Sequence, residues 1–230
     1  MADAFKVVRD FEQALCDFTG AKYAVTTTSC TMALLLAVAW HLRNEPTPRN
    51  LARPTPRKDA WVEVRQPIIS IPRYTYVGVP MSIINAGAWP VFRDDEWRGA
   101  YMLDPLPVWD CARLFTENMY IHPGPRSGQM QCVSFHASKT LGDSQGGAIL
   151  HDDQEADEWL RRARFDGRRE GVAPKDDTDL MLGWHCYLSP DVAARLLWKL
   201  SVLPRHNDPL PWGPGTNSDY PDLSTMECFK

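Results

Sequence analysis

Apolar and polar residues alternate along the chain in two different periods. Apolar side chains recur at helical spacing over residues 4–18, and this pattern ends at Gly20, a residue typical of helix ends. Further helices are predicted over 31–42, 77–85, 154–165 and 190–200. Short apolar runs predict strands over 23–27, 66–71, 90–92, 106–110, 131–135 and 148–151. Strands that alternate with helices favour an α/β fold with a mostly parallel sheet flanked by helices.

The stretches between these elements predict irregular structure. Residues 93–107 show no clear period, and a Pro- and Arg-rich stretch follows the 31–42 helix. We therefore expect one domain over 1–203 with a loop insertion at 44–62, and an irregular tail over 204–230. With 230 residues, 44% of them hydrophobic, the chain is long enough to form one α/β core.

The composition restricts the class of protein further. No run of eighteen apolar residues occurs, and the first residues lack the apolar core of a signal peptide. We expect a soluble, cytoplasmic protein without a membrane partner. Its six cysteines have no paired CxxC spacing, which indicates reduced thiols and no zinc or other metal site.

Two clusters of basic residues stand out against the formal net charge of −4, one at 43–58 and one at 161–169. The simpler interpretation is a solvated loop and a solvated helix face. The alternative is a surface for a phosphate-rich polymer, so nucleic acid is a possible partner.

One lysine is the strongest candidate for covalent chemistry. The predicted strand 131–135 leads into a polar turn that presents Lys139, and Gly146 and Gly147 follow before the next strand. A lysine fixed at the end of a buried strand suits a Schiff base, because its amine can be desolvated enough to lose its proton. Taken alone, the same lysine fits a solvated surface position.

Two other positions are candidates for binding charged groups, one for an anion and one for a cation. Thr31 opens an apolar helix and Ser29 precedes it, so the helix start is a phosphate site or a simple N-cap. Asp110 ends an apolar strand, where a buried carboxylate should pair with a cation or cap a helix.

Segments 24–34, 72–92, 108–113 and 134–169 resemble, in this order, motifs of the DegT/DnrJ/EryC1/StrS family. A weaker match lies at 183–189. Members of that family are sugar aminotransferases that use pyridoxal 5′-phosphate (PLP), with the fold type I architecture. The resemblance implies a reduced large domain of this fold, covering most of residues 8–200, without most of the small C-terminal domain.

The resemblance implies a role for each matching residue. Lys139 would form the internal aldimine with PLP and then move protons at the substrate carbon, so that an amino group passes to a keto acceptor. Asp110 would hold the protonated ring nitrogen, His136 would lie near the ring and Tyr76 would stack on it. The catalytic set is Lys139, Asp110 and His136. The cofactor-binding set is Ser29, Cys30, Thr31, Tyr76, Asp110, Arg113, Ser134, Lys139 and His185.

Some positions depart from the family pattern. Cys30 replaces the turn glycine, Arg113 replaces a Gln or His near the phenolic oxygen, and Tyr187 replaces an Arg. His185 replaces an Asn that reaches the phosphate of a neighbouring subunit, and the resemblance implies a homodimer.

Three functions are compatible with these observations. The first is an aminotransferase with an amine, amino acid or keto sugar as substrate. The second is a PLP-dependent decarboxylase, or another enzyme that remodels an amino-acid group on a modified base in phage DNA. The third is a noncatalytic remnant that serves for binding or dimerisation.

Overall fold

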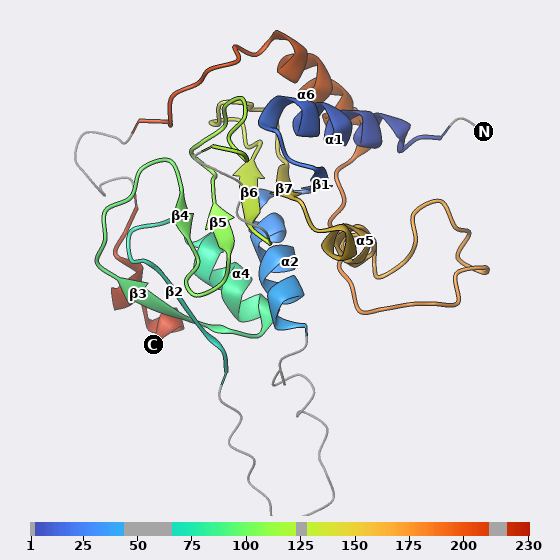
Figure 1. The fold of residues 1–230 in the computed structure, drawn as a ribbon. Helices are drawn as coiled ribbons and strands as arrows, with labels where there is room; N and C mark the ends of the chain where they lie inside the picture. Colours follow the sequence, from blue (N-terminus) through green and yellow to red (C-terminus); the bar gives the residue numbers. More distant parts are fainter. Residues whose placement is uncertain (1–2, 44–65, 123–127, 212–219) are drawn as a thin grey trace, which may run out of the picture.

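The fold is described from a computed structural model that covers residues 3–43, 66–122, 128–211 and 220–230 (Figure 1). The predicted loop insertion at 44–62 lies outside the described residues. Within the described ranges, the strands form one five-stranded sheet and one two-stranded sheet.

The larger sheet has the strand order β1-β7-β6-β5-β4. Its strands are β1 (Tyr23–Thr27), β4 (Tyr101–Met102), β5 (Val108–Asp110), β6 (Met130–Ser134) and β7 (Gly147–His151). The smaller sheet pairs β2 (Ile68–Pro72) with β3 (Trp89–Arg93) in parallel. An antiparallel bridge between Ser70 and Asp104 connects the two sheets.

The strand directions confirm the α/β class and add two reversed strands. Five strands run in one direction: β1, β2, β3, β5 and β6. β5 pairs in parallel with β6, and β1 has the same direction because β7 is antiparallel to both β1 and β6. The antiparallel Ser70–Asp104 bridge next to β4 gives β2 this direction, and β3 pairs in parallel with β2. β7 runs against both of its neighbours, and β4 runs against β5. The connection from β6 to β7 contains no helix in the structure, so it forms no parallel crossover.

β4 corrects the prediction of irregular structure over 93–107. The strand has only two residues, Tyr101 and Met102, which is too short to produce a visible alternation. It pairs with β5 in a tight hairpin, in which Tyr101 lies opposite Asp110.

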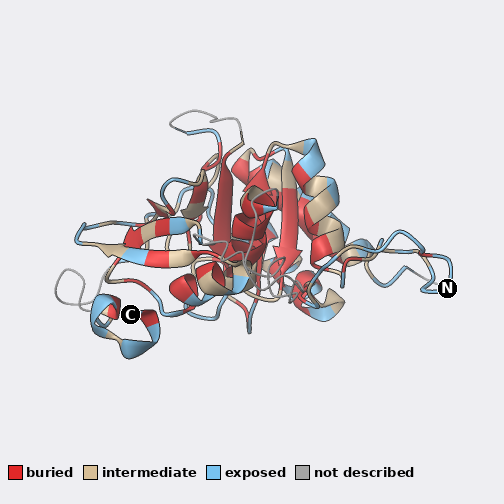
Figure 2. Ribbon diagram, turned by 90° about the horizontal axis from the view of Figure 1, so that it is seen from below, coloured by how far each residue is buried: buried red, intermediate tan, exposed pale blue. Residues whose placement is uncertain are grey.

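Helices cover both faces of the larger sheet. They are α1 (Lys6–Thr19), α2 (Cys30–Leu42), α4 (Gly78–Ala86), α5 (Gln154–Ala163) and α6 (Pro190–Val202). One buried cluster joins α2, α4 and α5 to the sheet, and the other joins α1 and α6 to it. Successive residues of β6, Cys132 and Val133, belong to different clusters, as the pleat of a strand requires. The sheet and α2 are therefore the most buried elements (Figure 2).

A buried ionic network connects α1 to β1 and α5. Glu12 accepts hydrogen bonds from the Thr26 backbone N–H (3.0 Å) and from Arg161 Nη1 (2.6 Å), and Arg164 also donates to it. Burial alone would raise the pKa of Glu12, but the Arg164 and Arg161 guanidinium groups lower it to about 2. The acid therefore remains charged and paired in the interior.

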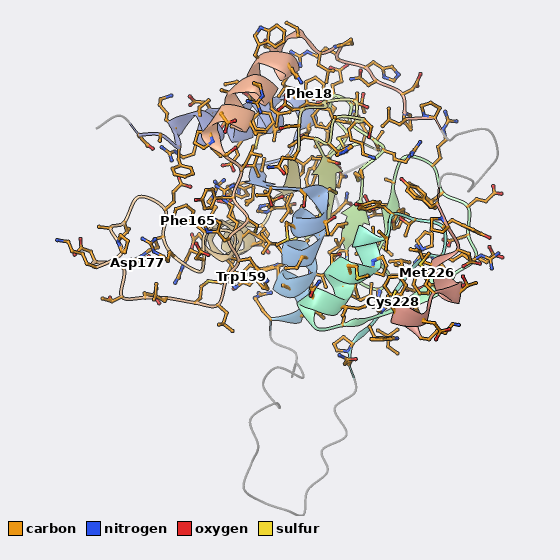
Figure 3. The ribbon with its side chains drawn as sticks, turned by 180° about the vertical axis from the view of Figure 1, so that it is seen from behind. Phe18, Trp159, Phe165, Asp177, Met226 and Cys228 are labelled. Atoms are coloured by element: carbon orange, nitrogen blue, oxygen red, sulfur yellow. The ribbon has the colours of Figure 1, made fainter. Side chains whose placement is uncertain are left out.

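The C-terminal residues pack against the domain. Residues 203–211 follow α6 past the end of the sheet, and residues 220–230 lie beside the β2–β3 pair, where Met226 and Cys228 are labelled in Figure 3. There Leu223 and Phe229 are buried, and the ring of Phe229 lies 5.7 Å from that of Phe92. Among the described residues after α6, the regular structure consists of two 3-10 turns, Leu223–Thr225 and Glu227–Phe229.

None of the helices in the described ranges is long and apolar enough to cross a bilayer. All six cysteines are free, and Cys30, Cys111, Cys132 and Cys186 are buried.

We expect the stability of the protein to fall at acidic pH through His151 of β7. This side chain is fully buried, and burial lowers its pKa from 6.5 to about 4. Between these pH values the unfolded chain binds a proton that the folded chain does not, so stability is complete above pH 6.5 and declines as the pH falls. Relative to His151→Leu, the wild type should lose about 3 kcal/mol more of its unfolding free energy between pH 7 and pH 4. Urea denaturation at each pH measures the difference, and parallel pH profiles for the two proteins would contradict it.

Candidate active site

A cavity of about 470 Å³ opens at the carboxyl ends of β1, β5 and β6, which run in the same direction. This edge of an α/β sheet is the usual location of a ligand site. The predicted residues that line the cavity are Ser29, Cys30, Thr31, Tyr76, Asp110, Arg113, Ser134, His136 and Lys139. The fold thus brings together residues separated by more than one hundred positions in the sequence.

A larger cleft of about 1010 Å³ lies apart from this cavity, between α1 and α5. None of the predicted site residues lines it. All four arginines that line it form ion pairs with acidic residues of the same chain: Arg9, Arg161, Arg162 and Arg169. We therefore take the smaller cavity as the candidate active site.

Asp110 is the buried acid of the cavity, with 4% of its surface exposed. Its carboxylate accepts hydrogen bonds from the Tyr101 hydroxyl (2.8 Å) and from the backbone N–H of Ala112 (2.9 Å). Burial raises the pKa of Asp110, although both hydrogen bonds and the Lys139 amine act to lower it. A cationic group in the cavity would stabilise the ionised carboxylate further.

Tyr101 and Thr75 extend this hydrogen-bonded chain and were missed in the sequence. The Thr75 and Tyr101 oxygens lie 2.6 Å apart, so Thr75 can donate to Tyr101 while Tyr101 donates to Asp110. The signal that could have found Tyr101 is its place opposite Asp110 in the β4–β5 hairpin. Two-residue strands leave too little pattern for such a pairing to be predicted.

The N-terminus of α2 forms one wall of the cavity. The helix begins at Cys30, one residue before the predicted start, and the Ser29 hydroxyl accepts a hydrogen bond from Met32 N (3.2 Å). Cys30 adopts helical backbone geometry, so its replacement of a glycine imposes no left-handed conformation. The first N–H groups of a helix have no acceptor within it, and together with the helix dipole they favour an anion.

Close backbone approach at Gly147 positions this helix start. A side chain at Gly147 would come within 2.5 Å of the Cys30 nitrogen, and β7 could then not pass so near to α2. Of the two adjacent glycines in the sequence, Gly147 is therefore required by its packing against the start of α2.

Lys139 lies half-buried in the loop that follows β6, and its N–H donates to the His136 carbonyl (2.8 Å). Burial lowers the pKa of the Lys139 amine, and the Arg113 guanidinium acts in the same direction, while Asp110 and Cys30 oppose them. A lysine with a lowered pKa presents more of the neutral, nucleophilic amine near pH 7.

Ser134 and His136 lie close to Lys139 in the chain, Ser134 at the end of β6 and His136 in the loop that follows it. Ser134 is buried at the end of β6, and its hydroxyl accepts a hydrogen bond from the His136 N–H (3.4 Å). His136 is exposed, with its Nδ1 3.0 Å from the Ser138 hydroxyl oxygen. Tyr76, which is 56% exposed and lies two residues before α4, also lines the cavity.

Tyr220 and Trp97 also line the cavity and were not predicted. Tyr220 accepts a hydrogen bond from Arg113 Nη1 (3.5 Å), although 107 positions separate the two residues. Trp97 donates to the Tyr74 carbonyl (3.0 Å), and its ring meets the Tyr101 ring edge to face at 4.6 Å. Neither residue lies in a pattern or motif that the sequence analysis could have used.

His185 is the one predicted residue that does not line the cavity. Its Nδ1 lies 2.8 Å from an oxygen of Asp166, and its ring packs against Tyr187. The side chain is exposed, and its assignment to the phosphate of a neighbouring subunit stays a prediction.

The lining of the cavity fits the three functional parts of PLP. Lys139 suits the aldehyde, the hydroxyl-lined start of α2 suits the phosphate, and the buried Asp110, with its raised pKa, suits a protonated ring nitrogen. Within the described ranges, no three His, Cys, Asp or Glu residues are grouped so as to hold a metal ion.

The sequence is similar to that of a curated protein. The spore coat polysaccharide biosynthesis protein SpsC of Bacillus subtilis is 24% identical over 192 residues, which cover 67% of this chain and 44% of SpsC. The chain therefore spans less than half the length of this curated relative.

Solved structures share the fold. The sugar aminotransferase CalS13 from Micromonospora echinospora superposes with a TM-score of 0.63 at 15% identity, covering 86% of this chain and 61% of CalS13. DesV from S. venezuelae, solved with a ketimine intermediate, gives a TM-score of 0.58 at 20% identity, with 88% and 57% covered.

The model of the DegT/DnrJ/EryC1/StrS aminotransferase family matches residues 2–47 and 108–208. These ranges make up more than half of the chain, and they contain Ser29, Asp110, Ser134 and Lys139. The chain therefore belongs to the DegT/DnrJ/EryC1/StrS aminotransferase family.

Proposed function

We propose that the protein is a PLP-dependent enzyme that transfers an amino group to a keto acceptor. One observation carries the proposal: Lys139, Asp110 and the N-terminus of α2 line a single cavity, although they come from three separate parts of the chain. Each is the residue type that one portion of PLP requires. A noncatalytic remnant would have no need to keep all three on one cavity.

In this proposal the residues divide the work of binding. The N–H groups at the start of α2, with the hydroxyls of Ser29, Thr31 and Ser134, hold the phosphate. Asp110 would accept a hydrogen bond from the ring nitrogen, and its bonds from Tyr101 and Ala112 fix the orientation of the carboxylate. Tyr76, which lines the cavity, would pack against the ring. When bound, PLP delocalises the electron pair that is left on the substrate carbon.

Lys139 performs the chemistry that belongs to the protein. Its neutral Nζ would hold PLP through the aldehyde carbon, and once released it would take up the proton of the substrate carbon that bears nitrogen. The position of His136 near the ring stays a prediction. Its hydrogen bond with Ser138 orients the imidazole. A keto sugar is the acceptor we propose, since CalS13 is a sugar aminotransferase with the same fold.

We also propose that two copies of the chain assemble. The arm between α5 and α6 extends away from the helices, with Asp177 labelled on it in Figure 3. It carries two exposed leucines, Leu180 at 62% and Leu182 at 84%, in addition to the exposed His185. Two exposed leucines on the arm that also carries His185 suit contact with a second copy.

The alternative of decarboxylation or remodelling on DNA gains no support from the second basic cluster. Arg161 binds Glu12 and Asp157, Arg162 binds Asp179, and Arg169 binds Asp177. Guanidinium groups paired within the chain have less charge to offer to a phosphate backbone. Most of the first basic cluster lies outside the described residues.

The covalent role of Lys139 is testable by trapping. We expect sodium borohydride to fix added PLP onto the protein, and peptide mass mapping to find the adduct on Lys139, because burial and Arg113 lower the pKa of this amine. Lys139→Ala should abolish the adduct. Lys22→Ala, which removes a lysine outside the cavity, should leave it unchanged. An adduct on a different lysine would refute the assignment.

The role of Asp110 is testable by an isosteric change. Asp110→Asn should still form the Lys139 adduct but convert L-glutamate about 100-fold more slowly or worse, because a neutral amide does not hold the ring nitrogen protonated. The spectral change of the bound cofactor on adding L-glutamate measures this rate. Asp104→Asn, an exposed acid in the same hairpin, serves as the control. An Asp110→Asn protein as fast as the wild type would exclude the proposed role.

A further inference from the structure

The end of the chain runs along the rim of the candidate active site. The residues concerned, 205–211 and 220–229, are called the C-terminal segment here. Its first part follows residues 113–117: Arg205 O accepts from Glu117 N (2.9 Å), and Leu210 N donates to Arg113 O (2.8 Å). The Asn207 N–H also donates to the Thr116 hydroxyl (3.0 Å). These bonds fix the segment to the loop that follows β5.

The second part of the C-terminal segment is fixed on the other side of the site. Leu223 is fully buried, and its N–H donates to the Arg73 carbonyl (3.0 Å). Asp222 pairs with Arg73 (3.5 Å) and forms a bridge with Tyr74. Arg73 and Tyr74 precede Thr75 and Tyr76, which line the cavity. Tyr220 lies between the two attachments and faces the cavity itself.

Arg113 is the residue that both parts of the segment hold. Its Nη2 donates to the Pro211 carbonyl, and its Nη1 donates to the Tyr220 hydroxyl (3.5 Å). Its backbone carbonyl accepts from Leu210 N. The guanidinium lines the same cavity as Lys139. An arginine held at its backbone and at both terminal nitrogens has little freedom to leave that wall.

We propose that the C-terminal segment is a positioning element of the active site, which holds the Arg113 guanidinium in the Lys139 cavity and thereby controls the reactivity of the Lys139 amine. Tyr220 is its positioning residue. The inference rests on the proposed function only in taking Lys139 as the reactive amine.

The charges around Lys139 determine the direction of the effect. Asp110 from β5 attracts a proton to the amine, and Arg113 from the following loop repels it. Cys30 from α2 is a neutral thiol near pH 7, because burial raises its pKa, and His136 lies on the same loop as Lys139. Burial lowers the pKa of Lys139 in any case, and if Arg113 is removed or displaced, no nearby cation among the described residues adds to that effect against Asp110, so the pKa of Lys139 rises.

The experiment measures Lys139 directly, without catalysis. The full-length protein is freed of aldehyde cofactors with hydroxylamine and labelled with a trace of acetic anhydride at a series of pH values. Peptide mass spectrometry then gives the labelling rate of Lys139. Arg113→Gln should raise the pKa of Lys139 by about one unit, so that labelling below that pKa falls about tenfold. Tyr220→Phe, which removes only the hydroxyl, should reduce labelling about threefold in the same pH range.

Three further variants separate positioning from general damage to the structure. Arg113→Lys keeps the charge and should restore labelling to within about threefold of the wild-type rate. Arg205→Gln alters an arginine of the same segment outside the cavity, and Tyr23→Phe removes a tyrosine hydroxyl elsewhere. Both should label as the wild type does.

The outcomes decide the inference separately from the proposed function. Wild-type labelling rates in Arg113→Gln would overturn it. Slow labelling in Arg113→Gln with wild-type rates in Tyr220→Phe would overturn the role of the C-terminal segment. If Arg113→Gln does not fold, Tyr220→Phe decides alone. Borohydride trapping of PLP in the wild type tests the proposed function independently.

Discussion

The site depends on the burial of one carboxyl group, that of Asp110 at the end of β5. Burial makes an unpaired charge there costly, so the surrounding structure has to supply compensation. Tyr101 and Ala112 donate hydrogen bonds to it, and Thr75 supports Tyr101 in turn. Even with these donors, a cation in the cavity would stabilise the ionised carboxylate further. The Lys139 amine and the proposed ring nitrogen can both supply that positive charge. The hairpin of β4 and β5 places Tyr101 opposite Asp110.

The sequence predicted the parts of the structure that have a local signal. The strand 23–27 matches β1, and the helices at 154 and 190 begin where the apolar period predicted them. Lys139, Asp110 and Thr31 were found because each lies at the junction of an apolar run and a polar turn. The resemblance of four ordered segments to one family then placed them on a common ligand, and the fold places them on a common cavity.

Other features could not be predicted because they depend on contacts between distant positions. β4 is too short to show a period, and the reversal of β7 depends on a loop that carries Lys139 in place of a helix. Tyr220 lies at the cavity, and the burial of Leu223 and Phe229 beside β2 and β3 holds the residues that follow it. In the sequence, the Pro-rich residues around them predicted an irregular tail with no relation to the site. The same segment now forms part of the wall that faces Lys139.

The most direct test of the account is a crystal structure of the full-length protein with PLP. We predict a covalent link from Lys139 Nζ to the aldehyde carbon, the ring nitrogen within hydrogen-bonding distance of Asp110, and the phosphate at the start of α2 beside Ser29 and Thr31. Cofactor bound in the cleft between α1 and α5, or a Lys139 amine directed into solvent away from the ligand, would contradict the account.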